Sequence, residues 1–242
     1  MHEQQLFENW FVHDLPIEDY QSNTYPTYER RINDFFSFLD SSIYLQQNTL
    51  LIKEEAVLTD NELRLVWQSL NGGDYATIVK LLMLTGQRLD EIAALSWQEL
   101  NIADAIISLP GSSTKNRGSH EVPLAATARS LLVARKQNGH AQVFGEHGYS
   151  GFSAPKLRLD KRIAELNGGT PIPPWVIHDI RRSVVTGMAK LGIAPHIIEC
   201  VVNHVSGFKR GVAGVYNKNQ YAPEKAEALR KWDAHIASIT GT

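Results

Sequence analysis

The sequence predicts a mainly helical protein with one small antiparallel β-sheet, an α+β fold. Apolar residues recur at helical spacing along most of the chain, and three short strand-like runs lie together near its middle. Hydrophobic residues make up 43% of the 242 residues and charged residues 21%, which is the balance of an ordinary globular protein. This length allows one large domain, or one domain with a smaller appendage.

Helices are expected in seven segments of the main body. Thr59 and Glu62 form a capping-box pattern ahead of periodic apolar residues. Gly72 and Gly73 end that helix, and the next helix is apolar enough to be central. The seven expected helices cover residues 56–70, 74–86, 127–137, 154–166, 177–192, 195–204 and 223–239.

The sheet is expected between the second and third of these helices. Residues 103–110, 112–115 and 120–124 form three short strand-like runs. Residues 116–119, with the sequence NRGS, are expected to join the last two runs as a tight turn.

The amino-terminal part differs from the rest in length and charge. Residues 1–62 carry 3 Lys+Arg and 12 Asp+Glu, a balance of -9, whereas residues 63–242 carry 21 and 14, a balance of +7. Residues 1–50 offer one helix, at 27–45, and fall below the roughly 70–80 residues that an independent core needs. We therefore expect an acidic appendage at 1–50 and a basic body at 51–242 that suits a polyanion.

The expected setting is reducing and intracellular. The single cysteine, Cys200, excludes an intramolecular disulfide and any CxxC site, and it fits a small buried side chain on a helix. No apolar run reaches the length of a membrane span, and the acidic start is unlike a signal peptide.

Several cationic residues and one tyrosine suit phosphoryl transfer. Arg88 follows the end of a buried helix, where a turn would aim it into a cleft and Glu91 would orient it. Lys115 lies beside the expected hairpin turn. His178 and Arg181 share one helix face, with Cβ atoms about 5–6 Å apart.

His204 ends the next helix, and Tyr216 lies among glycines and valines. Taken singly, each of these residues has an ordinary structural explanation: a cap, a solvated loop lysine, a structural histidine or a packed aromatic. Their joint order and spacing carry the functional argument.

In that order, the residues resemble the catalytic set of the tyrosine recombinases, the phage-integrase family. The local sequences are similar as well, most of all to integrases of satellite phages and genomic islands: LTGQRLDEIAALSW, TKNRGSHEVPL, WVIHDIRRSVVTGMAKLGI and VVNHVSG. The resemblance covers roughly residues 55–237. It implies the tyrosine recombinase catalytic-domain fold for residues 51–242.

The resemblance also implies a role for each residue. Arg88 and Arg181 would hold the scissile phosphate, and His178 and His204 would donate hydrogen bonds to it and assist proton movement. Glu91 matches the acidic residue that supports this set in the family.

Tyr216 would attack the phosphate and form a 3′-phosphotyrosyl intermediate, while Lys115 would be the general acid that protonates the leaving 5′-oxygen. No cofactor and no metal are implied. The implied partner is double-stranded DNA at attachment sites. The family works there as a tetramer, and we expect a monomer without DNA. The implied location is the bacterial cytoplasm, at the nucleoid, with no membrane partner.

The chain departs from the family pattern at two places. Members usually carry a helical core-binding domain before the catalytic domain, and residues 1–50 are too short for it, so they fit a remnant. Asn203 stands where many relatives have glycine.

Three alternatives to recombination stay open at this point. The first is a catalytically defective DNA-binding remnant, and the second is type IB topoisomerase-like strand relaxation. The third is a metal-dependent hydrolase built on the nine histidines. The sequence also leaves open whether the helix at 223–239 docks on its own chain or on a neighbour.

Overall fold

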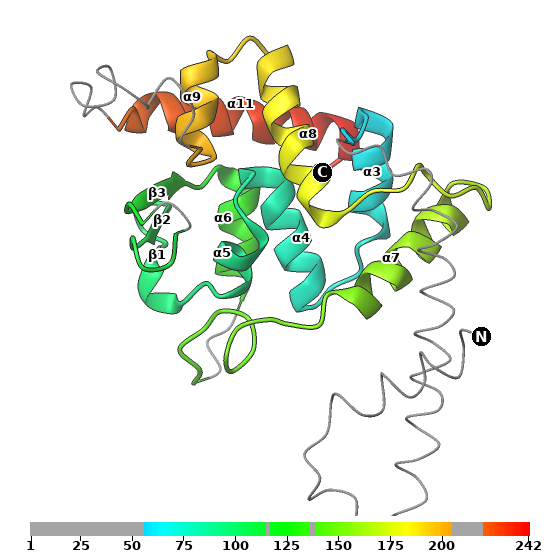
Figure 1. The fold of residues 1–242 in the computed structure, drawn as a ribbon, viewed down its shortest axis with the longest axis horizontal. Helices are drawn as coiled ribbons and strands as arrows, with labels where there is room; N and C mark the ends of the chain where they lie inside the picture. Colours follow the sequence, from blue (N-terminus) through cyan, green and yellow to red (C-terminus); the bar gives the residue numbers. More distant parts are fainter. Residues whose placement is uncertain (1–55, 115–116, 136–138, 205–219) are drawn as a thin grey trace, which may run out of the picture. The chain divides into compact units, whose positions relative to one another are not determined.

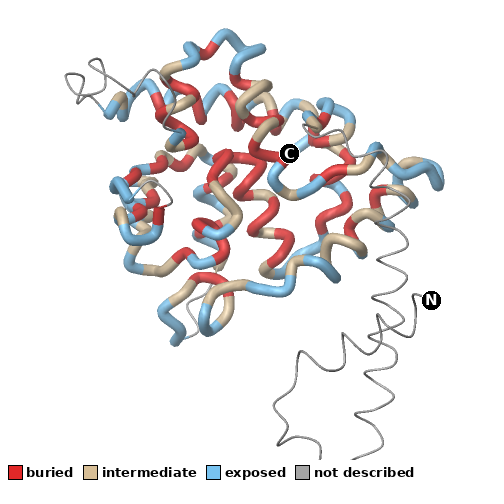
Figure 2. Tube along the Cα trace, viewed as in Figure 1, coloured by how far each residue is buried: buried red, intermediate tan, exposed pale blue. Residues whose placement is uncertain are grey.

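Helix α4 (Asp74–Thr85) lies at the centre of the core in the computed structural model, which describes residues 56–114, 117–135, 139–204 and 220–242. Nine of its twelve residues are buried (Figure 2). A helix that is apolar on all sides must be surrounded by other elements. Four helices pack against it (Figure 1): α5 (Leu89–Ala93), α6 (Ala126–Val133), α8 (Ile177–Lys190) and α11 (Ala222–Thr240).

The remaining helices complete a mainly helical fold, as the sequence predicted. Among the described residues they are α3 (Asp60–Ser69), α7 (Ser153–Leu166) and α9 (Pro195–Val201), with one 3-10 turn at Trp97–Glu99. Each of the seven predicted helices is confirmed, and α5 is an addition. The helix expected at 27–45 lies outside the described residues. The division into domains at 1–50 and 51–242 therefore stays a prediction.

The start of α3 has the capping box that its sequence predicted. The Glu62 backbone N–H donates to Thr59 Oγ1 at 3.3 Å, and the Thr59 N–H donates to Glu62 Oε2 at 2.7 Å. Two of the amide groups that a helix start leaves unpaired are satisfied in this way.

Gly86 ends α4 and lets two other helices approach it. Its φ of 66° lies in the left-handed region, and its N–H donates to the Leu82 carbonyl at 2.9 Å. A Cβ at this position would lie 2.9 Å from Val184 Cγ1 on α8 and 3.2 Å from Val202 Cγ1 after α9. A side chain larger than hydrogen would push these helices away from the carboxyl end of α4.

The small sheet has three antiparallel strands in the order β1-β2-β3. They are β1 (Leu100–Asn101), β2 (Ile106–Leu109) and β3 (His120–Pro123). The runs at 103–110 and 120–124 were correctly predicted as strands. Strand β1 has two residues, too few for the alternation that marks a strand in a sequence.

The strand predicted at 112–115 is wrong. Residues 111–114 form turns, and β2 pairs directly with β3. The Ser113 N–H donates to the Pro110 carbonyl at 2.9 Å, and Thr114 Oγ1 donates to the Gly118 carbonyl at 2.7 Å. The Thr114 hydroxyl therefore bonds to nearby backbone, while the Ser113 hydroxyl donates to Glu99 Oε1 at 3.2 Å.

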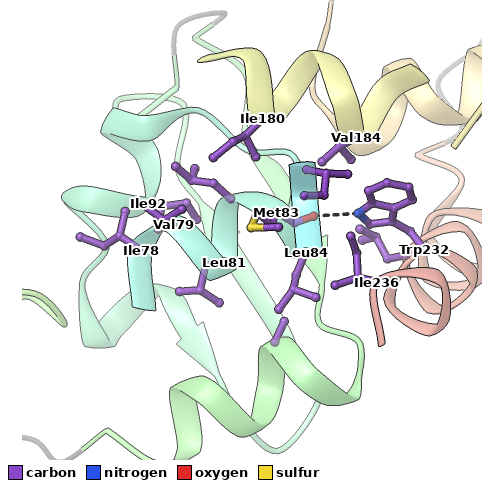
Figure 3. Close-up of a cluster of buried hydrophobic side chains, with 14 of the residues drawn as sticks. Ile78, Val79, Leu81, Met83, Leu84, Ile92, Ile180, Val184, Trp232 and Ile236 are labelled. Atoms are coloured by element: carbon purple, nitrogen blue, oxygen red, sulfur yellow. Dashed lines mark hydrogen bonds between the residues drawn. The ribbon is translucent and has the colours of Figure 1, made fainter. Parts of the chain in front are cut away.

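Helix α11 is part of the core of its own chain. Trp232 is fully buried, and its Nε1 donates to the Met83 carbonyl on α4 at 2.7 Å (Figure 3). Lys225 Nζ donates to the Glu121 carbonyl on β3 at 2.8 Å. In this single chain, α11 therefore packs on the core of the same chain.

A substitution at Gly187 should loosen the contact between α8 and α11. An added Cβ would lie 2.3 Å from Trp232 Cζ3, and an indole held on all sides cannot move aside. We expect Gly187→Ala to lower the free energy of unfolding by about 1–3 kcal/mol, although alanine is intrinsically the better helix former. Urea unfolding would measure this loss.

Gly72→Ala is the matched control. A Cβ at Gly72 would have no atom within 4 Å, so the expected change stays within about 0.5 kcal/mol. Equal stabilities for the two variants would contradict the packing argument.

Candidate active site

The site is built around the last turn of α9, which ends in a Schellman motif. The His204 N–H donates to the Glu199 carbonyl at 2.9 Å, and the Asn203 N–H donates to the Cys200 carbonyl at 3.4 Å. Asn203 lies in the left-handed region with φ 48°. Asparagine tolerates this conformation better than most other side chains, so it can end the helix in this way.

The next three carbonyls of this turn accept hydrogen bonds from side chains of other elements. A helix carboxyl end leaves such carbonyls unpaired and partly negative, so cationic and amide donors stabilise it. The Val201 carbonyl accepts from Gln87 Nε2 at 2.9 Å and from His120 Nε2 at 3.1 Å. The Val202 carbonyl accepts from Arg181, and the Asn203 carbonyl accepts from Arg88 at 3.2 Å.

Arg181 is a buried cation that joins the carboxyl ends of two helices. It is 8% exposed, and its guanidinium donates to the Gly86 carbonyl at 2.7 Å and to the Val202 carbonyl. Burial, and then the positive charge of Arg88, lower the pKa of Arg181 to about 10, while Glu91 acts in the opposite direction. The guanidinium therefore stays protonated at neutral pH.

Arg88 is oriented by the carboxylate that the sequence paired with it. Its guanidinium donates to Glu91 Oε1 at 3.0 Å, and its backbone N–H donates to Glu91 Oε2 at 3.1 Å. Glu91 is buried and Arg88 is half-buried, and Glu91 and the Asn203 carbonyl hold the two ends of the guanidinium beside a cleft that Arg88 lines.

Two clefts meet at His178 and Arg181, which line both of them. One cleft has a volume of about 410 Å³ and also contains His204 and Arg182. The other has a volume of about 350 Å³ and also contains Arg88. The structure thus brings together four of the six predicted catalytic residues. Lys115 and Tyr216 lie outside the described residues, so their positions stay predictions.

His178 lies at the exposed rim of both clefts. Partial burial, and then the charges of Arg182, Arg181 and Arg88, lower its pKa below the ordinary value, whereas Asp179 raises it. His178 is therefore neutral at pH 7, with one N–H to donate and one nitrogen to accept.

Asp179, the residue after His178, caps the amino-terminal end of α8. It is 3% exposed, its Oδ2 accepts from the Val176 N–H at 2.8 Å, and its Oδ1 accepts from Arg182 at 2.5 Å. An acidic residue in the first helical turn is a common sequence signal, yet it marks a cap and gives no indication of what the helix carries.

Gln87, His120 and Asp179 are the site residues that sequence reasoning missed. Gln87 and His120 donate to a carbonyl 114 and 81 residues further along the chain, so no local spacing shows the contact. The available signal for Gln87 was a polar side chain between Gly86 and Arg88, next to a buried helix.

None of the helices among the described residues has the length and apolar character of a membrane span. Within the same residues, no group of three or more His, Cys, Asp or Glu side chains is arranged to hold a metal ion.

The chain matches the phage integrase family over residues 56–221, and it therefore belongs to that family. Prophage integrase IntZ of Escherichia coli strain K12 is 30% identical over 172 residues, which cover 67% of this chain and 40% of IntZ. A shufflon-specific DNA recombinase of Escherichia coli is 32% identical over 117 residues, which cover 48% of this chain and 27% of the recombinase. The chain spans less than half the length of both relatives.

Solved structures of the same kind are similar at lower identity. The integrase from mycobacterium phage Brujita is 16% identical with a TM-score of 0.49, over 81% of this chain and 72% of that one. The XerH site-specific recombinase bound to difH substrate is 18% identical with a TM-score of 0.48, over 62% of this chain and 47% of that one.

The Schellman motif predicts how Asn203 responds to substitution. Valine is strongly disfavoured in the left-handed region, so Asn203→Val is expected to lower the free energy of unfolding by about 1–2 kcal/mol. Asn203→Gly should stay within about 1 kcal/mol of the wild type, since glycine adopts this conformation readily. Urea unfolding of both variants tests the motif, and a valine variant as stable as the glycine variant would argue against it.

The cationic surroundings of His178 predict its titration in the DNA-free protein. The midpoint of its titration, followed by NMR, should lie below the ordinary pKa of about 6.5. The imidazole therefore becomes mostly protonated only at a pH below this midpoint. Arg182→Gln removes the largest charge effect and should raise the midpoint. Arg158→Gln, an exposed change on α7, should leave the midpoint in place. A midpoint unaffected by Arg182→Gln would rule out the electrostatic cause.

Proposed function

We propose that this chain is the catalytic domain of a site-specific DNA recombinase, which cuts and rejoins DNA through a 3′-phosphotyrosyl intermediate. One observation carries the proposal: Arg88 and Arg181 are held at the carboxyl end of α9, beside clefts that also contain His178 and His204. Family membership supports the same conclusion.

The guanidiniums of Arg88 and Arg181 are suited to binding a phosphate. Each has five N–H donors, and the hydrogen bonds that the structure shows use two of them in each residue. The protein contacts fix each guanidinium plane in advance, and the remaining donors are available to the non-bridging oxygens. Donors placed before the reaction typically contribute about 10²–10³ in rate each.

The reaction is a transfer of the phosphoryl group to tyrosine and back. We propose that Tyr216 Oη attacks the phosphorus, that the bond to the 5′-oxygen breaks, and that Lys115 protonates this leaving oxygen to give a free 5′-hydroxyl. A neutral His178 suits a hydrogen bond to the phosphate or the transfer of the phenol proton. Because a phosphodiester replaces a phosphodiester, a second 5′-hydroxyl can reverse the attack on a new strand. The proposal assigns no step to a metal or a cofactor.

The proposed partner is double-stranded DNA at attachment sites, with a tetramer on DNA and a monomer without it. The +7 balance of residues 63–242 favours a polyanionic partner. Such a protein would act at the bacterial nucleoid.

A covalent-adduct assay tests this function. The chain is incubated, with chelator present, with a nicked duplex that carries the attachment site of its element, so that the cleaved end diffuses away. We expect a protein–DNA adduct that survives denaturation, with Tyr216 as the linked residue. Tyr216→Phe should abolish it, because the phenylalanine ring has no nucleophile.

Tyr221→Phe is the matched control, since it removes a neighbouring hydroxyl and should leave the adduct in place. An adduct with Tyr216→Phe would refute the assignment of the nucleophile. Salt-dependent DNA binding by a wild type that forms no adduct would indicate the non-catalytic remnant. Relaxation of supercoiled DNA without sequence preference would indicate the topoisomerase-like alternative.

A further inference from the structure

We infer that Gln87 and His120 are positioning residues of the DNA-cleavage site, acting through the Val201 carbonyl at the end of α9. The inference rests on the proposed function. Both side chains are buried, at 1% and 6% exposure, and they reach this carbonyl from different elements. Neither residue lies on the face of α8 that carries His178.

The Val201 carbonyl is a key point of the site because it directly precedes the two carbonyls that hold the arginines. Those of Val202 and Asn203 accept from the guanidiniums of Arg181 and Arg88. The residues that carry these carbonyls belong to one hydrogen-bonded turn, so a displacement at Val201 would shift both acceptors. It would displace His204 as well, whose own N–H is bonded within the same turn.

Gln87 uses both N–H groups of its amide for this purpose. Nε2 donates to the Val201 carbonyl at 2.9 Å and to the Thr85 carbonyl at 2.9 Å. Its Oε1 is buried and has no hydrogen-bond partner among the described residues. An unpaired buried acceptor lowers the stability of the fold. Stability alone therefore does not explain a glutamine at position 87, whereas a role in placing the turn does.

His120 connects the sheet to the same turn. It is the first residue of β3. Its Nε2 must carry the proton to donate to the Val201 carbonyl. The sheet and the loop after α4 thus hold one carbonyl from two directions.

The test compares cleavage rate with DNA affinity in isosteric variants. In Gln87→Met and His120→Leu the donors are lost while the volume is nearly kept. We expect the rate of adduct formation at saturating DNA to fall by on the order of 10²-fold, with the Kd for DNA within about threefold of the wild type. His120→Gln places an amide N–H at the reach of Nε2 and should restore most of the rate.

Thr127→Val is the matched control for stability. It removes a hydrogen bond between Thr127 Oγ1 and Asp233 Oδ2, on α6 and α11, and should leave the cleavage rate unchanged. A wild-type rate in Gln87→Met and His120→Leu would overturn the inference. So would an equal loss of rate in Thr127→Val, or a His120→Gln variant as slow as His120→Leu.

A second measurement separates this inference from the proposed function. Hydrogen exchange of the Asn203 and His204 amides in the DNA-free protein reports the turn itself. Exchange should be faster in Gln87→Met and His120→Leu than in the wild type and in Thr127→Val, and unchanged exchange would overturn the inference. If the wild-type protein forms no covalent adduct with DNA, the proposed function is refuted. The exchange rates would still show whether Gln87 and His120 hold the turn.

Discussion

The buried Arg181 guanidinium, held by the carboxyl ends of α4 and α9, is the contact on which the rest of the site depends. Removing a guanidinium from water is unfavourable, and carbonyls at two helix ends offset that cost because the helix dipoles are negative there. The contact requires both helices to end at one place. Gly86 makes this possible, since any larger residue would collide with α8 and the end of α9.

Stability and binding are therefore combined in the same few groups. The carbonyls that accept from the two arginines also fix the planes in which their remaining N–H groups point. The mutual repulsion of Arg88 and Arg181, which contributes to the lowered pKa of Arg181, persists in the DNA-free protein. An anion bound between them would relieve this repulsion, so the pair favours a negatively charged ligand.

The sequence predicted the helices, the class of fold and the family, because these depend on periodic apolar residues and on residues close in the chain. The capping box at Thr59 and the contact of Arg88 with Glu91 are local in the same sense. The strand at 112–115 was wrongly predicted, since β-propensity cannot distinguish a strand from a turn that a threonine hydroxyl holds. Gln87 and His120 were missed because their shared acceptor is distant in sequence and is backbone, which carries no residue-specific signal.

The position of Trp232 has a consequence for synthesis of the protein. Its indole completes the core around Met83, which precedes it by 149 residues. During translation α4 therefore leaves the ribosome long before α11 does. The apolar surface of α4 that α11 covers stays exposed until α11 has emerged. The core therefore closes late in translation, and a chain truncated before α11 would leave this apolar surface exposed.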